Sequence, residues 1–338
     1  MLEWWWIVGF ALLSLMLTAV LRRYALARSL MDVPNARSSH SVPTPRGGGV
    51  AIVVAFLLAT ACLGATGRLS ADLLMAITGA GGLVAVIGFM DDHGHIAARW
   101  RLLWHFLAAV WALVWLGGLA PLDLFGWRVD LGLFGSVLAA FYLVWMLNLY
   151  NFMDGIDGIA SVEAVSVCVG ACLVHTFAGA GEQVLAPAML AAAVAGFLYW
   201  NFPPARIFMG DAGSGFLGLV LGVLSLQAGW LSPNLFWAWL ILLGVFVVDA
   251  TVTLLRRLLR GEKVYEAHRS HAYQYASRRY GRHLPVTLAV LAINMVWLMP
   301  WALAVSVGWL DGVSGILIAY LPLVLLAMKF HAGKAERP

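Results

Sequence analysis

The sequence predicts an all-α integral membrane protein that crosses the bilayer about eleven times. Of its 338 residues, 62% are hydrophobic and 11% are charged, whereas roughly a quarter of the residues of a soluble domain are charged. Apolar runs of the roughly 20 residues that one crossing needs recur along the whole chain. The 35 glycines and 16 tryptophans are typical of close helix packing in membranes and of aromatic side chains at the bilayer surface.

The apolar runs follow one another with short connections, so we expect a single transmembrane domain over residues 1–338. The first run lacks a basic segment before it and is followed by Arg22 and Arg23, which favours a retained span over a cleaved signal peptide. The predicted spans lie near residues 4–22, 48–66, 73–90, 102–119, 132–150, 159–178, 185–201, 213–230, 235–255, 285–307 and 313–329.

The basic residues indicate the orientation of these spans. Of the 21 lysines and arginines, only Arg68 and Arg128 fall in gaps on the same side as the N-terminus, and the other nineteen fall on the opposite side. Lysine and arginine concentrate in cytoplasmic loops. We therefore expect the N-terminus outside and the C-terminus in the cytoplasm.

The predicted cytoplasmic loops carry the unusual polar motifs. These loops lie near residues 23–47, 91–101, 148–158, 202–215 and 256–284, while the loops on the other side carry few such groups. We expect one site on the cytoplasmic face, assembled from several loops.

Two amides and two carboxylates end the fifth predicted span. Asn148, Asn151, Asp154 and Asp157 recur at every third residue, so on a helix they share one face. One Asn or Asp suffices to cap a helix, whereas aligned polar groups at the edge of a bilayer need a cation, a polar ligand or water to face. The spacing favours a binding site over a polar helix end.

Two further motifs place carboxylates where a phosphate could bind. Asp91 and Asp92 directly end the third predicted span, where a carboxylate pair can hold Mg²⁺, act as a base or simply begin a solvated loop. Asp211 follows Gly210 and opens a Gly-rich turn that leads into the eighth span. Free N–H groups at a helix N-terminus suit a phosphate, and a carboxylate beside it suits a bridging Mg²⁺.

The fifth loop is basic. Its outer arginines fit membrane topology and anionic lipid, but His268, Arg269 and His271 offer donors that suit a pyrophosphate or sugar hydroxyls. Asp249, within the ninth predicted span, is a further candidate because a carboxylate in the membrane is costly. The alternative for Asp249 is a pair with a basic residue of the adjoining loop.

In their order along the chain, these motifs resemble the polyprenyl-phosphate N-acetylhexosamine-1-phosphate transferases, the MraY/WecA superfamily. The resemblance extends from Asp32 to Gln274. It rests on Asp32-x-Pro-x-x-Arg37-x-x-His40 with Pro43-x-Pro-x-Gly-Gly, on Asp91-Asp92, on the Asn/Asp cluster, on Phe208-Met-Gly-Asp211-x-Gly-Ser and on the late His/Arg loop.

The resemblance implies a Mg²⁺-dependent glycosyl-1-phosphate transferase. Undecaprenyl phosphate would attack the sugar-proximal phosphate of a UDP-activated amino sugar, giving a lipid pyrophosphoryl sugar and UMP. Mg²⁺, with Mn²⁺ as an alternative, would neutralise the diphosphate. The implied setting is the bacterial inner membrane with the site facing the cytoplasm, with membrane lipid but no nucleic acid as a partner and a homodimer as a candidate oligomeric state.

The resemblance also implies residue roles. Asp211 and Asn151 would hold the metal with support from Asp154, while Asp91 and Asp92 would meet the lipid phosphate, where one of them is a candidate base. The implied substrate-binding residues are Asp157 near the nucleotide, Arg101 at a phosphate, Asn148, His40 and Arg46, and His268, Arg269 and His271 at the diphosphate and sugar.

One stretch departs from the family pattern. His271-Ala272-Tyr273-Gln274 stands where related enzymes carry a His-x-His-His run, and it resembles the branch that includes WbpL. That branch starts O-antigen chains of lipopolysaccharide on N-acetylhexosamines or deoxy-N-acetylhexosamines. The competing class is a multi-span transporter of an anionic substrate, for which we would expect polar groups deep within several spans and inverted repeats.

Overall fold

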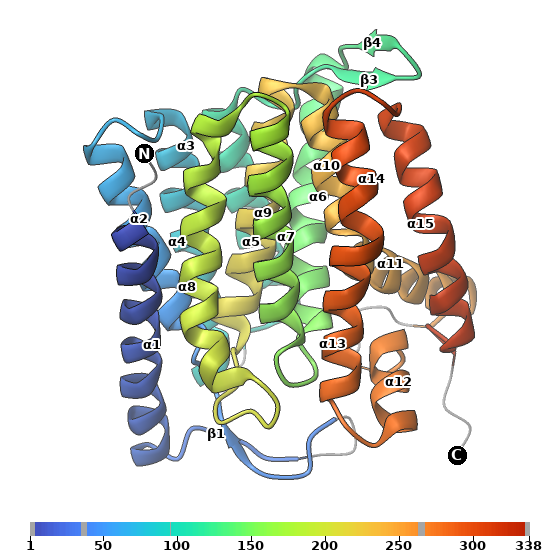
Figure 1. Ribbon diagram of the computed structural model, residues 1–338. Coiled ribbons are helices and arrows are strands. Elements are labelled where there is room, and N and C mark those ends of the chain that lie inside the picture. Colours follow the sequence, from blue (N-terminus) through green and yellow to red (C-terminus); the bar gives the residue numbers. More distant parts are fainter. Residues whose placement is uncertain (1–3, 35–38, 95, 263–267, 335–338) are drawn as a thin grey trace.

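The computed structural model describes residues 4–34, 39–94, 96–262 and 268–334, which form a bundle of helices (Figure 1). Two short antiparallel strand pairs are its sheet structure in these ranges, β1 (Met31–Asp32) with β2 (Thr44–Pro45) and β3 (Leu122–Leu124) with β4 (Trp127–Val129). The helices are α1 (Trp4–Ala27), α2 (Val50–Ala65), α3 (Ala71–Met75), η1 (Ala76–Gly81), α4 (Gly82–His93), α5 (Ala98–Leu116), α6 (Gly132–Met153), α7 (Ile159–Phe177), η2 (Gly181–Val184), α8 (Leu185–Asn201), α9 (Asp211–Leu231), α10 (Pro233–Leu242), α11 (Gly244–Leu259), α12 (Ala272–Tyr280), α13 (Leu284–Ala292), η3 (Ile293–Leu298), α14 (Met299–Ser306) and α15 (Gly312–Lys329).

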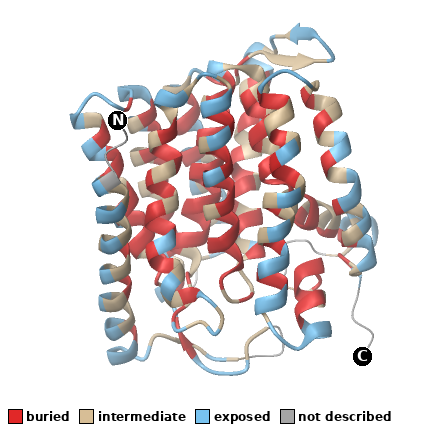
Figure 2. Cartoon of the chain, in the orientation of Figure 1, coloured by how far each residue is buried: buried red, intermediate tan, exposed pale blue. Residues whose placement is uncertain are grey.

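The all-α membrane class is confirmed. Among the described residues, eight helices are long and apolar enough to cross a membrane, or nine if the bent pair α10 and α11 is one span. Large apolar side chains are exposed on the outer helices, for example Leu12 and Met16 on α1 and Leu317 and Leu321 on α15. Figure 2 shows exposed positions along the length of both helices. A soluble protein rarely exposes such surfaces. The total of eleven spans and their orientation stay predictions.

The ninth predicted span, 235–255, is wrong as a single straight crossing. The chain bends by 70° between α10 and α11. Leu243 leaves the helical path, and Gly244 lets α15 pack into the bend, since a Cβ there would lie 2.9 Å from the ring of Tyr320. A hydropathy window cannot detect this bend because the residues on both sides of it are apolar.

Helix α9 lies at the centre of the bundle. Nearly all of its residues are buried, and it packs against α4, α6 and α10. Small residues permit this packing: a side chain at Gly218 would collide with the backbone of α6 at Met146 and Leu147. Close approach through glycine is the usual means of helix association in membranes, where apolar burial gives little driving force.

The site described below lies where α4 and α6 end and α9 and α12 begin, at the lower end of the bundle in Figure 1. The segment before α2 joins the segment before α9 through backbone hydrogen bonds. Gly48 N–H donates to the Phe208 carbonyl at 2.9 Å, Gly49 N–H to the Met209 carbonyl at 2.8 Å, and Phe208 N–H to the Pro45 carbonyl at 2.8 Å. Two loops about 160 residues apart therefore form one rigid wall.

We predict that Gly88→Ala destabilises the protein while Gly82→Ala in the same helix does not. A Cβ at Gly88 would lie 2.6 Å from both N and Cα of Ala212, so α4 and α9 would have to separate, whereas a Cβ at Gly82 meets nothing within 4 Å. Overpacking of this kind typically costs about 1–3 kcal/mol. Thermal unfolding of the detergent-solubilised variants measures the difference, and equal midpoints for the two variants would contradict the close contact of α4 with α9.

Candidate active site

A polar cavity of about 230 Å³ lies among these helix ends. Its walls come from the segment before α2, from α4 and α6, from the loop after α6 and from the starts of α9 and α12. The structure brings seven of the sequence-predicted residues to this polar cavity: His40, Arg46, Asp92, Asn151, Asp154, Asp157 and Asp211. Arg37 of the first motif lies outside the described residues.

A second cavity of about 180 Å³ lies beside the first and has mostly apolar walls, so we call it the apolar-walled cavity. Val84, Ile87, Leu102 and Leu147 supply apolar walls. Its polar lining residues are Asp91, Arg101, His105, Asn148, Asn151 and Asp211. Asn151 and Asp211 line both cavities and form the wall between them.

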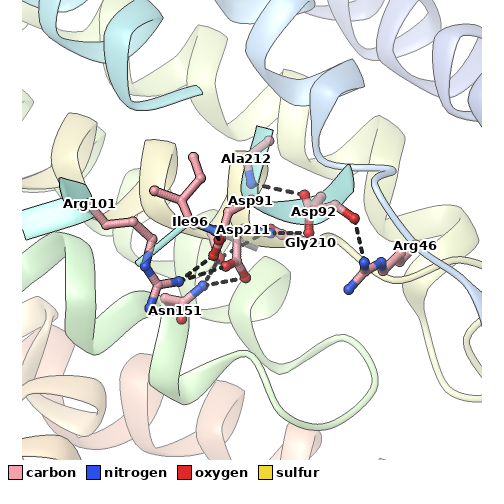
Figure 3. Close-up of polar contacts among 10 residues, drawn as sticks. Arg46, Asp91, Asp92, Ile96, Arg101, Asn151, Gly210, Asp211 and Ala212 are labelled. Atoms are coloured by element: carbon pink, nitrogen blue, oxygen red, sulfur yellow. Dashed lines mark hydrogen bonds and ion pairs between the residues drawn. The ribbon is translucent and has the colours of Figure 1, made fainter. Parts of the chain in front are cut away.

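Asp92 caps the N-terminus of α9 from α4 (Figure 3). Its carboxylate accepts hydrogen bonds from the backbone N–H groups of Asp211 at 3.1 Å and Ala212 at 3.3 Å. A carboxylate at a helix N-terminus satisfies otherwise unpaired donors and interacts favourably with the helix dipole. These N–H groups are therefore already occupied, and our expectation that they would be free for a phosphate is wrong.

Gly210, the residue before α9, leaves room for this cap. Its φ is +79°, and a Cβ at this position would lie 2.7 Å from Asp92 Oδ2. The backbone conformation and the lack of space both favour glycine. On the other side of Asp92, the Arg46 guanidinium donates to its backbone carbonyl, so the cap is joined to the segment before α2 (Figure 3).

Asp91 points away from Asp92 into the apolar-walled cavity. Helix α4 continues through both residues to His93, and successive side chains on a helix point in different directions. One Asp91 oxygen accepts from the Ile96 N–H at 2.8 Å, and the other pairs with the Arg101 guanidinium. Arg101 also approaches Asp211 Oδ2 at 3.5 Å, so a cation lies beside the shared wall.

Asn151 holds Asp211 at that wall. The Asn151 amide donates to Asp211 Oδ1 at 2.9 Å and to the Ser214 hydroxyl at 3.0 Å. Asn148, one turn earlier on α6, donates to the carbonyl of Val144 at 2.7 Å. Of the two amides, Asn151 is the one that contacts the Asp211 carboxylate.

Asp154 ends α6 within the polar cavity. Burial raises the pKa of its carboxyl well above the ordinary 3.8, and the nearby carboxylates of Asp211, Asp92 and Asp157 raise it further. With Asp32, five carboxyl groups line one small cavity, which is costly unless protons or cations balance them. This concentration of negative charge and oxygen atoms fits a hard divalent cation.

No group of three or more His, Cys, Asp or Glu side chains in the described part of the chain is arranged as a ready-made metal site. Mg²⁺ does not require one, because it commonly uses one or two carboxylates with water and substrate phosphates. Asp211, with the amide oxygen of Asn151 and with Asp154 nearby, offers such a partial ligand set.

Asp157 lines the polar cavity and belongs to a hydrogen-bonded network that includes His283. Its carboxylate accepts from the Ala205 N–H at 3.0 Å and pairs with His283 Nδ1 at 3.1 Å, while His283 Nε2 donates to the Ser39 carbonyl at 2.9 Å. Although burial acts in the opposite direction for each group, hydrogen bonding within the pair lowers the pKa of Asp157 and raises that of His283.

Sequence reasoning missed three residues of the polar cavity: His283, Gln274 and Asn201. His283 is a histidine at the start of a span in the basic loop, which was a usable signal. Asn201 accepts from the Gly158 N–H at 3.1 Å and donates to the Ile207 carbonyl at 3.0 Å, so it joins two loops. Gln274 is the residue after Tyr273 in the stretch that departs from the family pattern.

His268, Arg269 and His271 do not line the polar cavity, contrary to prediction. His271 is only 3% exposed and lies at the start of α12, with Nδ1 3.5 Å from an Asp249 oxygen. Burial, with His271 and Arg257 nearby, lowers the pKa of His268 to about 3. A neutral imidazole cannot supply the charge that a pyrophosphate attracts.

Asp249 lies beside His271 of the adjoining loop, as the alternative considered above expected, and it also binds backbone donors. Its two oxygens accept from the backbone N–H groups of Ala272 at 2.9 Å and Tyr273 at 3.0 Å, and Thr253 donates to it at 3.2 Å. Asp249 therefore caps α12 as Asp92 caps α9. Its influence on the site is indirect, through the position of α12.

Comparisons with known proteins agree with this geometry. A family model described as glycosyl transferase family 4 matches residues 74–229. The chain is 32% identical over 292 residues to a protein of Bacillus subtilis named a probable undecaprenyl-phosphate N-acetylglucosaminyl 1-phosphate transferase, covering 83% of this chain and 78% of the relative. It is 30% identical over 300 residues to the decaprenyl-phosphate N-acetylglucosaminephosphotransferase of Mycolicibacterium smegmatis, covering 78% of this chain and 72% of the relative.

A phospho-N-acetylmuramoyl-pentapeptide-transferase of Moorella thermoacetica is also similar, at 34% identity over 198 residues. That match covers 54% of this chain and 61% of the relative. Two of the three relatives are named for N-acetylglucosamine and the third for N-acetylmuramoyl-pentapeptide, so they do not by themselves select the sugar.

We predict that the Asp157–His283 pair stabilises the protein most between about pH 4 and pH 6.5. The raised pKa of His283 contributes stability that is full below its ordinary 6.5 and is lost as the pH rises through the raised value. The lowered pKa of Asp157 contributes stability that is full above its ordinary 3.8 and is lost as the pH falls through the lowered value. Thermal unfolding of wild type and His283→Gln from about pH 4 to about pH 9 measures the effect, and a difference that does not shrink above about pH 7 would contradict the ion pair.

Proposed function

The chain belongs to the family of polyprenyl-phosphate N-acetylhexosamine-1-phosphate transferases, and we propose that it transfers an N-acetylhexosamine or deoxy-N-acetylhexosamine 1-phosphate from a UDP-sugar to undecaprenyl phosphate. The acceptor phosphate oxygen forms a bond to the sugar-proximal phosphorus. The bond from that phosphorus to the bridging oxygen breaks, and UMP leaves with both electrons of that bond. The product is an undecaprenyl pyrophosphoryl sugar.

The observation that carries this proposal is the wall of Asn151 and Asp211 shared by two unlike cavities. A transferase must bring a water-soluble donor and a lipid acceptor to the same phosphorus. The polar cavity suits the UDP-sugar, and the apolar-walled cavity suits a phosphate attached to a hydrocarbon chain. The transferred phosphorus would lie at the wall, where both substrates reach Asp211.

Basic residues on each side fit these assignments. Arg46 and His40 line the polar cavity and suit a diphosphate. Arg101 lines the apolar-walled cavity and suits the acceptor phosphate, with Asp91 holding its guanidinium. Asp157 and His283 lie farther along the polar cavity and also line the neighbouring cavity of about 470 Å³, which would receive the nucleoside.

The geometry supports different roles for the two adjacent carboxylates. Asp92 is engaged by two backbone donors, so it suits positioning Asp211 better than accepting a proton. Asp91 is paired with Arg101. A general base is not essential, because a phosphate monoester is already largely ionised near neutral pH.

Mg²⁺ would be held by Asp211 with Asn151, and Asp154 would support it; Mn²⁺ is the alternative. When bound, the cation would neutralise the diphosphate and the departing UMP. The five carboxyl groups around the polar cavity are the feature of the chain that favours a cation there.

We further propose that the site faces the cytoplasm of the bacterial inner membrane and that the product starts O-antigen synthesis. The basic residues on the side of the site support the orientation. The stretch from His271 to Gln274 supports the O-antigen branch. A transporter would place its binding groups near the middle of the membrane, whereas both cavities here lie at helix ends.

We predict that Asp211→Ala lowers turnover by about 100- to 1,000-fold or more, because it removes the carboxylate common to both cavities. The assay measures UMP released from UDP-N-acetylhexosamines in the presence of undecaprenyl phosphate and Mg²⁺. Asp72→Ala is the matched control, since Asp72 is exposed on α3 near the other end of the bundle (Figure 1). Unchanged turnover in Asp211→Ala, or UMP release without the lipid, would overturn the proposed reaction.

A further inference from the structure

Gln274 lies on the first turn of α12 and lines the polar cavity. It is only 6% exposed, so it is a polar side chain buried against the site. We propose that its amide N–H₂ group donates a hydrogen bond to an uncharged oxygen of the donor sugar and thereby selects the sugar. This inference rests on the proposed transferase function.

The orientation of the amide is fixed by the chain itself. The backbone N–H of His271 donates to Gln274 Oε1 at 3.2 Å, as part of a capping box. A backbone N–H can only donate, so the atom that faces it must be the carbonyl oxygen. Nε2 is therefore the other end of the amide, and it has no acceptor among the described residues.

The helix that carries Gln274 is held on two sides. Asp249 accepts from the N–H groups of Ala272 and Tyr273, and the Tyr273 hydroxyl donates to the Phe152 carbonyl at 2.9 Å, at the end of α6. Movement of α12 would break these bonds. The unused donor is therefore presented in a fixed direction, as recognition of one ligand group requires.

The donor faces the segment between Asp154 and Asp157. A Cβ at Gly155 would lie 3.3 Å from Gln274 Nε2 and would collide with the Tyr273 hydroxyl. The absence of a side chain at Gly155 therefore keeps the amide accessible from the cavity. A ligand bound there is within reach of both the acidic segment and the amide.

The chemistry of the group favours the sugar over the diphosphate. A diphosphate is best met by cations, and Arg46 enters the cavity from the segment before α2. Gln274 is neutral and enters from α12. Its natural partner is a neutral acceptor, and among the groups of an amino sugar the acetamido carbonyl is the strongest. A buried donor left without a partner also penalises a sugar that lacks the acceptor.

The test is steady-state kinetics of Gln274→Glu with UDP-N-acetylglucosamine and UDP-N-acetylgalactosamine, with UMP as a competing inhibitor. Glutamate keeps an acceptor for the His271 N–H and so keeps the cap, but its carboxylate has no donor. We expect KM for the UDP-sugars to rise about tenfold while the inhibition constant of UMP is unchanged. Gln183→Glu, which adds the same charge on η2, is the matched control.

The outcomes separate the inference from the proposed function. An equal loss of affinity for UMP would mean that the new charge repels phosphate or that Gln274 contacts the nucleotide, and either overturns the sugar assignment. Unchanged kinetics would also overturn it. If Gln274→Glu does not accumulate as folded protein, Gln274→Met must show the same pattern, a raised KM for the UDP-sugars with an unchanged inhibition constant for UMP. A wild-type enzyme that releases no UMP from these two sugars or from UDP-deoxy-N-acetylhexosamines under any lipid condition would overturn the proposed function itself.

Discussion

The site depends on the contact between the Asp92 carboxylate and the first N–H groups of α9. This contact joins α4 to the central helix and fixes the start of α9, and with it the position of Asp211. Gly88 and Gly210 leave the space that the contact needs. Arg46 extends the connection to the segment before α2. A carboxylate that caps a neighbouring helix satisfies donors that lipid or a dry interior could not satisfy.

The same device recurs at α12, where Asp249 accepts from the first two N–H groups. The acidic residues thus fall into two groups. Asp92 and Asp249 hold helix ends, and Asp157 holds the Ala205 backbone and His283. Asp211, which side chains of Asn151 and Arg101 contact, and Asp154 line the cavity without capping a helix, which makes them the better candidates for contact with a cation and phosphate. The carboxylates of these motifs therefore have two roles: some hold helix ends and loops in place, and others are placed to contact the substrates.

Much of this arrangement could be predicted from the sequence. Hydropathy placed the helices well because a membrane crossing imposes a long apolar run, and three-residue spacing identified Asn151 and Asp154. The bend at Leu243 could not be predicted, since both halves are apolar. The separate directions of Asp91 and Asp92 required knowledge that α4 continues through both. The backbone donors that Asp249 binds lie more than twenty residues away, and this long-range contact holds His271 in the interior.

The most direct test of the central claim is a crystal structure with Mn²⁺ and UDP bound, in which the anomalous signal locates the metal. We expect a metal peak about 2.1 Å from an Asp211 oxygen, with the diphosphate in the polar cavity facing Arg46 and the nucleoside toward Asp157. A metal bound away from Asp211, or a diphosphate bound in the apolar-walled cavity beside Arg101, would contradict it.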